Sequence, residues 1–192
     1  MNFAEYNVKD ANLEEILLAL KSLDTVEAVA LGGSRSTGAS DENSDYDIYI
    51  YCAEIPTAET RENLLGKYCS IAEFGNHYWE SEDNTVMNNG IPVDIIYREV
   101  DRFGRYIDTV IKGGKAFNGY TTAFWHNIKN SKVLFDKTGT FTKFRDMAQI
   151  DFPENLRSAI IKNNRNLLNG KLPSYDRQIK KAQERGDIVS VN

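Results

Sequence analysis

Two short apolar runs joined by a Gly-Gly-Ser turn constrain the fold of this chain more than any other feature. The first run, residues 26–31, is short and continuous in the manner of a buried strand. Gly32 and Gly33 end this strand, and Ser34 begins a short turn or helical segment. A second strand-like run follows at residues 46–51. The pattern predicts two adjacent strands with a polar turn between them.

Three aspartates accompany these strands. Because residues two apart in a strand point to the same face, Asp45 and Asp47 project side by side, roughly 7 Å apart at the backbone. A third apolar run, residues 91–97, carries Asp94 among hydrophobic neighbours, where an ionised carboxylate needs a partner. Carboxylates this close repel one another unless a cation lies between them. An oxygen-rich set of this kind suits Mg²⁺ or Mn²⁺, although Asp94 could instead form a structural ion pair with Arg98.

The spacing of these features is more specific than any one of them. Gly33-Ser34 is followed by ten intervening residues, then by Asp45-Tyr46-Asp47 between apolar residues and by the later apolar strand with Asp94. Together they resemble the nucleotidyltransferases of the DNA polymerase beta superfamily. Within it, the chain is most similar to the bacterial branch that adenylylates antibiotic hydroxyls, such as those of aminoglycosides. Other phosphate-binding motifs fit worse, because the chain contains no Gly-x-x-x-x-Gly-Lys-Ser/Thr sequence.

The resemblance implies roles for the residues that carry it. Asp45, Asp47 and Asp94 would be both the catalytic carboxylates and the ligands of two divalent ions, Mg²⁺ or Mn²⁺. Gly33 and Ser34 would hold the nucleoside triphosphate, and the backbone amides of such a turn can donate to phosphate oxygens.

Two further residues near the turn are candidate nucleotide ligands. Arg35 follows Ser34 directly and could also contact phosphate, or it could form a surface salt bridge with Asp41 or Glu42. Ser44 either contributes to the nucleotide site or caps the turn before the second strand.

The resemblance also implies the reaction, which is transfer of AMP from Mg-ATP to an acceptor hydroxyl with pyrophosphate leaving. The acceptor expected first is a small molecule such as an aminoglycoside or a lincosamide. One alternative is a protein or RNA hydroxyl, as in the small antitoxin-type relatives, although the long region beyond the core argues against a minimal antitoxin. The other is a nucleotide-binding regulatory protein without chemistry, against which the three aspartates argue.

Composition narrows the choice of partners. The 192 residues carry a net charge of −5, and an acidic protein is poorly suited to sequence-independent binding of nucleic acid, which depends on phosphate neutralisation. The sequence contains no apolar run long enough to span a bilayer, and its first residues do not resemble a secretion signal. Two isolated cysteines indicate reduced thiols rather than a disulfide scaffold. We therefore expect a cytoplasmic protein without a membrane partner. His77 and His126 lack ligand spacing and are interpreted as ordinary histidines.

Periodicity predicts an α/β (α+β) fold, with a small mixed sheet flanked by helices and followed by a mostly helical region. Helices are expected over residues 12–23, 57–68, 99–112, 121–128, 139–147, 153–169 and 174–185, and further strands over residues 71–74, 84–87 and 132–135. Asn12 and Glu15 resemble a capping box, and Asn89-Gly90 a hairpin turn. Gly113-Gly114 suggests a boundary between a catalytic core, residues 1–112, and a C-terminal region, residues 113–192. The apolar residues 188–191 suggest a further segment, a partner chain such as a second copy in a homodimer, or fraying.

Overall fold

The computed structural model describes residues 10–38, 44–119, 121–169 and 174–187. The chain divides into two compact units. The first contains the residues up to Tyr106 together with Trp125–Gln149, and the second contains Ile107–Phe124 and the residues from Ile150 onward. Among the described residues, no helix is long and apolar enough to cross a membrane.

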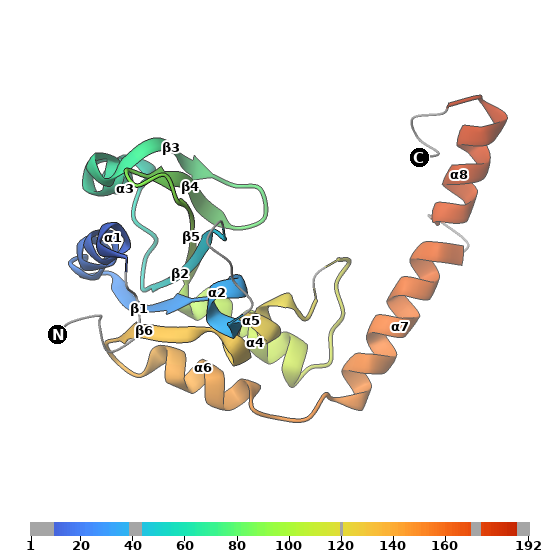
Figure 1. Cartoon of the computed structure of the whole chain (residues 1–192). Coiled ribbons are helices and arrows are strands. Elements are labelled where there is room, and N and C mark those ends of the chain that lie inside the picture. The colour runs from blue at the N-terminus through green and yellow to red at the C-terminus, as the bar shows by residue number, and fades with distance from the viewer. Residues whose placement is uncertain (1–9, 39–43, 120, 170–173, 188–192) are drawn as a thin grey trace. The chain divides into compact units, whose positions relative to one another are not determined.

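A mixed sheet forms the centre of the first unit (Figure 1), as the sequence predicted. Its described strands are β1 (Val26–Leu31), β2 (Tyr46–Cys52), β3 (Cys69–Asn76), β4 (Ser81–Met87), β5 (Pro92–Glu99) and β6 (Lys132–Asp136). They lie in the order β3-β4-β5-β2-β1-β6. The pair β2·β5 is parallel, and the other neighbours are antiparallel. The two strands that carry Asp47 and Asp94 are therefore adjacent at the centre of the sheet.

One face of the sheet packs against α1 (Ala11–Lys21) and α3 (Ala58–Leu65), which is followed by the short 3₁₀ helix η2 (Gly66–Tyr68). The apolar residues of α1 recur at helical spacing and meet alternate residues of the strands, because a strand directs every second side chain to the same face. The buried residues include Leu13, Ile16, Leu17, Leu20, Val29, Ile48, Ile50, Val93 and Ile95. This core fixes which face of β2 and β5 is left for polar side chains.

The start of α1 differs from the predicted capping box. Asp10, rather than Asn12, is the N-cap, and its Oδ1 accepts hydrogen bonds from the backbone amides of Asn12 at 3.0 Å and Leu13 at 3.3 Å. An aspartate caps as well as an asparagine does and adds a favourable negative charge at the helix N-terminus. The same carboxylate accepts from the Asn89 side chain, so the cap also ties α1 to the β4–β5 hairpin.

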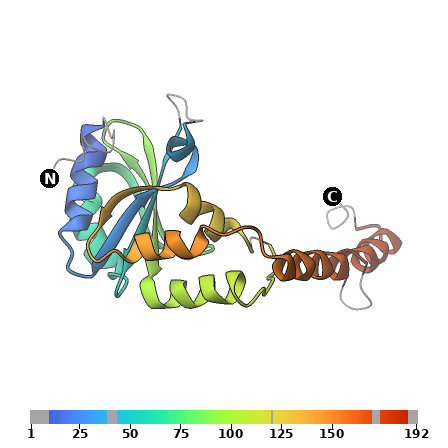
Figure 2. The same cartoon turned by 90° about the horizontal axis from the view of Figure 1, so that it is seen from below.

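The opposite face of the sheet is covered at one end by aromatic side chains and helices of the first unit. α4 (Val100–Ile111) begins here and continues into the second unit, while α5 (Ala123–Asn130) and α6 (Thr140–Ala148) follow. Tyr51 makes edge-on contacts with Phe103 and Phe141, at centroid distances of 5.3 and 5.2 Å. The Trp125 indole donates to the carbonyl of Ala148 at 2.8 Å and joins α5 to α6. Figure 2 shows α6 alongside the strands from below.

The second unit contains α7 (Glu154–Asn169) and α8 (Tyr175–Glu184), which contact each other. Both lie close to their predicted positions. The apolar end at residues 188–191 falls outside the described residues. The boundary at Gly113 stays a prediction, but residues 125–149 pack with the first unit because β6 pairs with β1.

Candidate functional site

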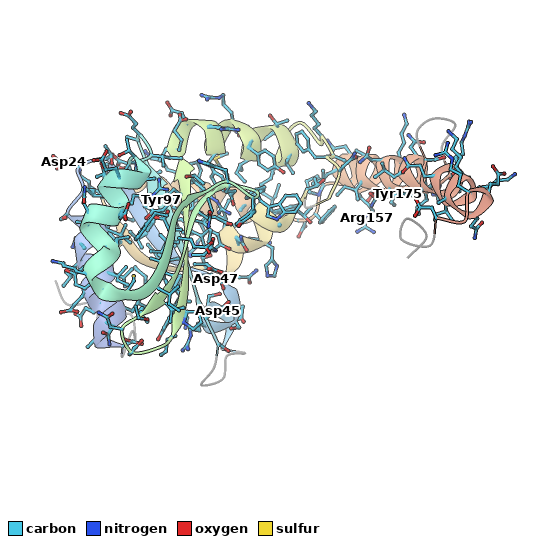
Figure 3. The ribbon with its side chains drawn as sticks, turned by 90° about the horizontal axis from the view of Figure 1, so that it is seen from above. Asp24, Asp45, Asp47, Tyr97, Arg157 and Tyr175 are labelled. Carbon is cyan, nitrogen blue, oxygen red and sulfur yellow. The ribbon has the colours of Figure 1, made fainter. Side chains whose placement is uncertain are left out.

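The structure brings the three predicted carboxylates to one end of the central strands. Asp47 on β2 lies directly opposite Asp94 on β5 in the parallel register, and Asp45 immediately precedes β2. Figure 3 shows Asp45 and Asp47 near each other. Burial raises the pKa of the Asp47 carboxyl, and the charges of Asp45 and Asp94 raise it further. The three groups therefore form one electrostatically coupled set.

The Gly-Gly turn lies directly against Asp47. The amide of Gly32 donates to the Asp47 carbonyl at 2.8 Å. Gly33 has a positive φ of 60°, and a β-carbon at this residue would lie 1.7 Å from Asp47 Oδ2. Glycine is required here for two reasons, since L-residues disfavour this backbone conformation and the carboxylate fills the space of any side chain.

Asp94 is held by an amide and not by the arginine considered from the sequence. Asn84 Nδ2 on β4 donates to Asp94 Oδ1 at 2.9 Å. Arg98 instead donates to both carboxylate oxygens of Glu80 at 2.8 Å and to the Tyr51 hydroxyl at 3.1 Å. The hydrogen-bond donor beside Asp94 is therefore a neutral amide and not a cation.

The donor chemistry of this set fits a hard divalent cation, because oxygen ligands are those that Mg²⁺ and Mn²⁺ prefer. The described residues nevertheless contain no group of three or more His, Cys, Asp or Glu side chains placed to hold a metal ion. The aspartates are therefore coupled through their charges without converging on one point. Carboxylate rotation would be needed to bring them onto an ion.

Arg35 holds the entrance to β2. Its Nε donates to the carbonyls of Ser44 at 2.9 Å and Asp45 at 3.0 Å, and its guanidinium lies 4.0 Å from the centre of the Tyr46 ring. Asp41 and Glu42, the alternative partners, lie outside the described residues. Arg35 thus positions the backbone beside the aspartates, and direct contact of Arg35 or Ser44 with a nucleotide stays a prediction.

A pocket of about 200 Å³, lined by glycine, hydroxyl, amide and imidazole residues, opens next to the turn. One wall consists of Gly32, Gly33 and Ser34 with the following residues of α2 (Gly33–Thr37). The other wall is α5, with His126, Asn127, Asn130 and the adjoining Ser131. The pocket therefore joins the predicted phosphate-binding turn to a helix that begins ninety residues later in the sequence.

Tyr49 fixes the position of the second wall. Asn127 Nδ2 donates to the Tyr49 hydroxyl at 3.0 Å. The Tyr49 ring lies 4.3 Å from the Arg98 guanidinium, and its edge would be 2.4 Å from a β-carbon at Gly32. Burial raises the pKa of Tyr49 to about 12, so the hydroxyl stays protonated.

Similarity to known proteins covers the part of the chain that carries the three aspartates. Residues 13–117, more than half of the chain, match the family described as nucleotidyltransferase domain. The chain belongs to this family. No curated protein matches the chain. Among solved structures, it resembles the structure described as Cid1 in complex with its short product ApU, with 19% sequence identity and a TM-score of 0.39. That similarity covers 55% of this chain and 33% of the Cid1 chain, so the chain spans about a third of that structure.

Sequence reasoning missed three side chains of this site, namely Tyr49, Asn84 and Asn127. Tyr49 carried a signal, because it lies two residues after Asp47 and shares its strand face. Asn84 and Asn127 reach the site only through tertiary pairing, which no local pattern reveals.

Proposed function

We propose that this chain transfers a nucleoside monophosphate, AMP from Mg-ATP, to a hydroxyl group of a small molecule such as an aminoglycoside or lincosamide antibiotic. The observation that carries the proposal is the position of Asp47. Its carboxylate lies against the Gly33 backbone and opposite Asp94, and both neighbouring aspartates raise its pKa. Such mutual repulsion lowers the stability of the free protein. A bound cation would relieve the repulsion, so the same arrangement favours cation binding.

Asp45, Asp47 and Asp94 are the residues that would hold two divalent ions. When bound, the ions would neutralise charge on the triphosphate and make the acceptor hydroxyl more acidic. Asp47 would be shared between the nucleotide and acceptor sides, because it lies between the Gly33 turn and Asp94.

The pocket beside Gly33 is the proposed nucleotide-binding site. Ser34 and the turn amides are donors for phosphate oxygens, while Asn127 and Asn130 offer amide groups from the other wall. The hydroxyl and amide groups in the lining of this pocket offer hydrogen-bond partners for the sugar and phosphates.

The chemical step is an in-line displacement. The acceptor oxygen forms a bond to the α-phosphorus, the bond from that phosphorus to the bridging oxygen breaks, and pyrophosphate leaves with the bond's electron pair. Asp94 takes the proton of the acceptor hydroxyl. The neighbouring strands β2 and β4 hold Asp94 at the centre of the sheet. This restricts the directions from which its carboxylate can approach the reacting oxygen.

The charge around Asp94 favours a cationic acceptor. Residues 69–87, which form the β3–β4 hairpin, include four acidic side chains and no lysine or arginine. Glu80 and Asp83 form ion pairs with Arg98 and Arg61, so the net negative charge of the hairpin comes from Glu73 and Glu82. Glu82 shares the face of Asp94, and its pKa is raised by burial and then by the charges of Asp94 and Glu80. A polyanionic RNA would be repelled along this approach, whereas an amino-sugar acceptor would be attracted.

The test is to incubate the protein with Mg²⁺, ATP labelled at the α-phosphate and separate acceptors. These are an aminoglycoside, a lincosamide, a short RNA and an unrelated protein. We expect the label on a small-molecule acceptor, with one pyrophosphate released for each transfer. Label on the RNA or protein alone would overturn the proposed acceptor class, and nucleotide binding without any transfer would overturn the enzymatic assignment.

A matched pair of variants tests the pocket. Asn127→Ala removes an amide from the wall and its bond to Tyr49, so we expect weaker ATP binding in calorimetry. Asn88→Ala removes an exposed amide that bonds the Lys67 carbonyl, away from the pocket. Equal ATP affinities for the two variants would contradict this placement of the nucleotide.

A further inference from the structure

Three side chains form a directional chain of hydrogen bonds that ends on Asp94. Asn76 Nδ2 donates to Asn84 Oδ1 at 2.7 Å, and Asn84 Nδ2 donates to Asp94 Oδ1 at 2.9 Å. Asn76 Nδ2 also donates to Glu73 Oε2 at 3.3 Å. The chain runs from edge strand β3 through β4 to the central strand β5, along one face of the sheet.

The order of donors and acceptors fixes which way each amide faces. An asparagine has nearly the same shape with its oxygen and nitrogen exchanged, so only its partners select the orientation. If Asn84 were reversed, its oxygen would face the Asp94 carboxylate and two acceptors would repel. Asn76 prevents this reversal because its amino group already bonds Asn84 Oδ1, and Glu73, which only accepts when ionised, orients Asn76 in turn.

A β-bulge places Asn76 on the face of the sheet from which its side chain reaches Asn84. The β3–β4 register shifts between Glu73 and Asn76, so these residues lie opposite Asn84 and Glu82. Residues directly opposite each other in an antiparallel pair share a face, and the extra residue of the bulge therefore brings Glu73 and Asn76 to the same side.

The bulge is secured from the other face of the sheet. Gly75 within it has a positive φ of 82°, and its amide donates to Asp83 Oδ1 at 2.9 Å. Asp83 is fully buried and pairs with the buried Arg61 at 2.9 Å. Arg61 also donates to the carbonyl of Pro56 at 2.7 Å. This ion pair consequently holds the backbone from which Asn76 projects.

We propose that Asn84 is a positioning residue for Asp94, and that Asn76 sets the orientation of Asn84. By occupying Oδ1, Asn84 fixes the plane of the carboxylate and leaves Oδ2, which accepts no hydrogen bond from the described residues, for the acceptor side. This inference rests on the proposed role of Asp94 in nucleotidyl transfer. Partners of this kind commonly change activity ten- to a hundredfold when removed.

The test compares single-turnover transfer and ATP affinity in four variants. Asn84→Ala should lower the transfer rate by about tenfold or more while ATP affinity is unchanged. Asn76→Ala, which leaves Asn84 in place, should lower the rate less. Asp94→Asn should abolish most transfer, and the matched control Asn88→Ala should behave as the parent. An Asn84→Ala protein that transfers at the parental rate would overturn the proposal.

Double variants separate positioning from a general loss of stability. If both asparagines act through Asp94, then Asn76→Ala should have no further effect on the Asn84→Ala rate, and Asn84→Ala none on the Asp94→Asn rate. Independent, additive losses would overturn the chain of contacts. A fully active Asp94→Asn protein is a different result, because it would remove Asp94 from the chemistry and with it the proposed mechanism.

A measurement without nucleotide or metal provides a second readout. The side-chain NH₂ protons of Asn84 should exchange slowly in NMR spectra because one of them is bound to a carboxylate. Asn76→Ala should accelerate this exchange, whereas Asn88→Ala should not. Fast exchange in the parent protein would show that the contact with Asp94 is not maintained.

Discussion

The carboxylate of Asp47 occupies the space that a side chain at Gly33 would need, with Oδ2 1.7 Å from the position of a β-carbon. The turn and the acid therefore cannot be varied independently. Any side chain at Gly33 must displace the carboxylate that the proposed chemistry uses most.

Gly33→Ala should consequently fold but lose transfer. The carboxylate is the far end of a flexible side chain, so it can rotate away, and misplacing a catalytic group by about 1 Å can cost a hundredfold in rate. The positive φ adds roughly 1–2 kcal/mol of destabilisation. The measurements are single-turnover transfer and urea unfolding.

Gly38→Ala is the matched control for that variant. Gly38 also has a positive φ, 78°, but a β-carbon there would meet nothing within 4 Å. It should therefore show the backbone cost without the loss of transfer. Equal activity losses in the two variants would show that the steric relationship with Asp47 is not the cause.

Asp47→Asn should make the metal-free protein more stable at neutral pH while removing activity. The folded-state pKa of Asp47 is raised above its ordinary value of 3.8 by burial and by the charges of Asp45 and Asp94. The proton is thus held more tightly in the folded state, and the stability it contributes below pH 3.8 is lost as pH rises through the folded pKa. Asparagine avoids that loss.

Thermal unfolding in EDTA checks this prediction. The gain from Asp47→Asn should be present at pH 7 and shrink as the pH falls toward 3.8, and Mg²⁺ should stabilise the parent more than the variant. Asp24→Asn, at an exposed aspartate outside the site (Figure 3), should change little. A variant less stable than the parent at pH 7 in EDTA would contradict the role of charge repulsion.

Arg61→Met should destabilise the protein by about 3–5 kcal/mol, because it leaves the buried Asp83 carboxylate without its counter-charge. Both side chains of this pair are almost inaccessible, at 3% and 0% exposure. Lys112→Met breaks an exposed pair with Asp108 and should cost less than about 1 kcal/mol. Urea unfolding measures both, and similar losses would argue against the buried pair as an anchor of the β3 bulge.

Cys52 should resist alkylation in the folded protein. Burial raises the pKa of its thiol to about 12, so almost no thiolate is present at pH 8. Cys69 is half-buried and its pKa is also raised by burial, so it should react slowly but first. Mass spectrometry after iodoacetamide treatment distinguishes the two, and Cys52 labelled ahead of Cys69 would contradict the burial argument.

The local parts of this structure could be predicted from the sequence. β1 occupies the predicted residues 26–31, and the Gly-Gly turn and the alternation of β2 place Asp45 and Asp47 beside each other. These features depend on the two-residue alternation of a strand and on the conformations that glycine allows. Both can be recognised from residues that are consecutive in the sequence. The same alternation places the charge of Asp45 close enough to raise the pKa of Asp47.

The contacts of Asp94 could not be predicted, because they depend on hairpin register. An Asn-Gly pair usually forms a two-residue turn, but the hairpin pairs Val86 with Pro92 and places Gly90 at a φ of 86°. A slip of one residue exchanges the faces of a strand. With the two-residue turn, Asn84 would have faced away from Asp94, and the role of Glu80 as the partner of Arg98 depends on the same pairing.

Because β6 pairs with β1, the part of the chain needed to complete the sheet extends beyond the residues that match the family. The family match ends at residue 117, whereas the strand that covers β1 begins at Lys132. A fragment ending at residue 117 would expose the backbone groups of β1, a buried apolar strand, as a new sheet edge open to pairing between molecules. A deletion variant that keeps the matched residues 13–117 but lacks β6 is therefore expected to lose solubility, and one that continues through Ala148 is expected to keep it.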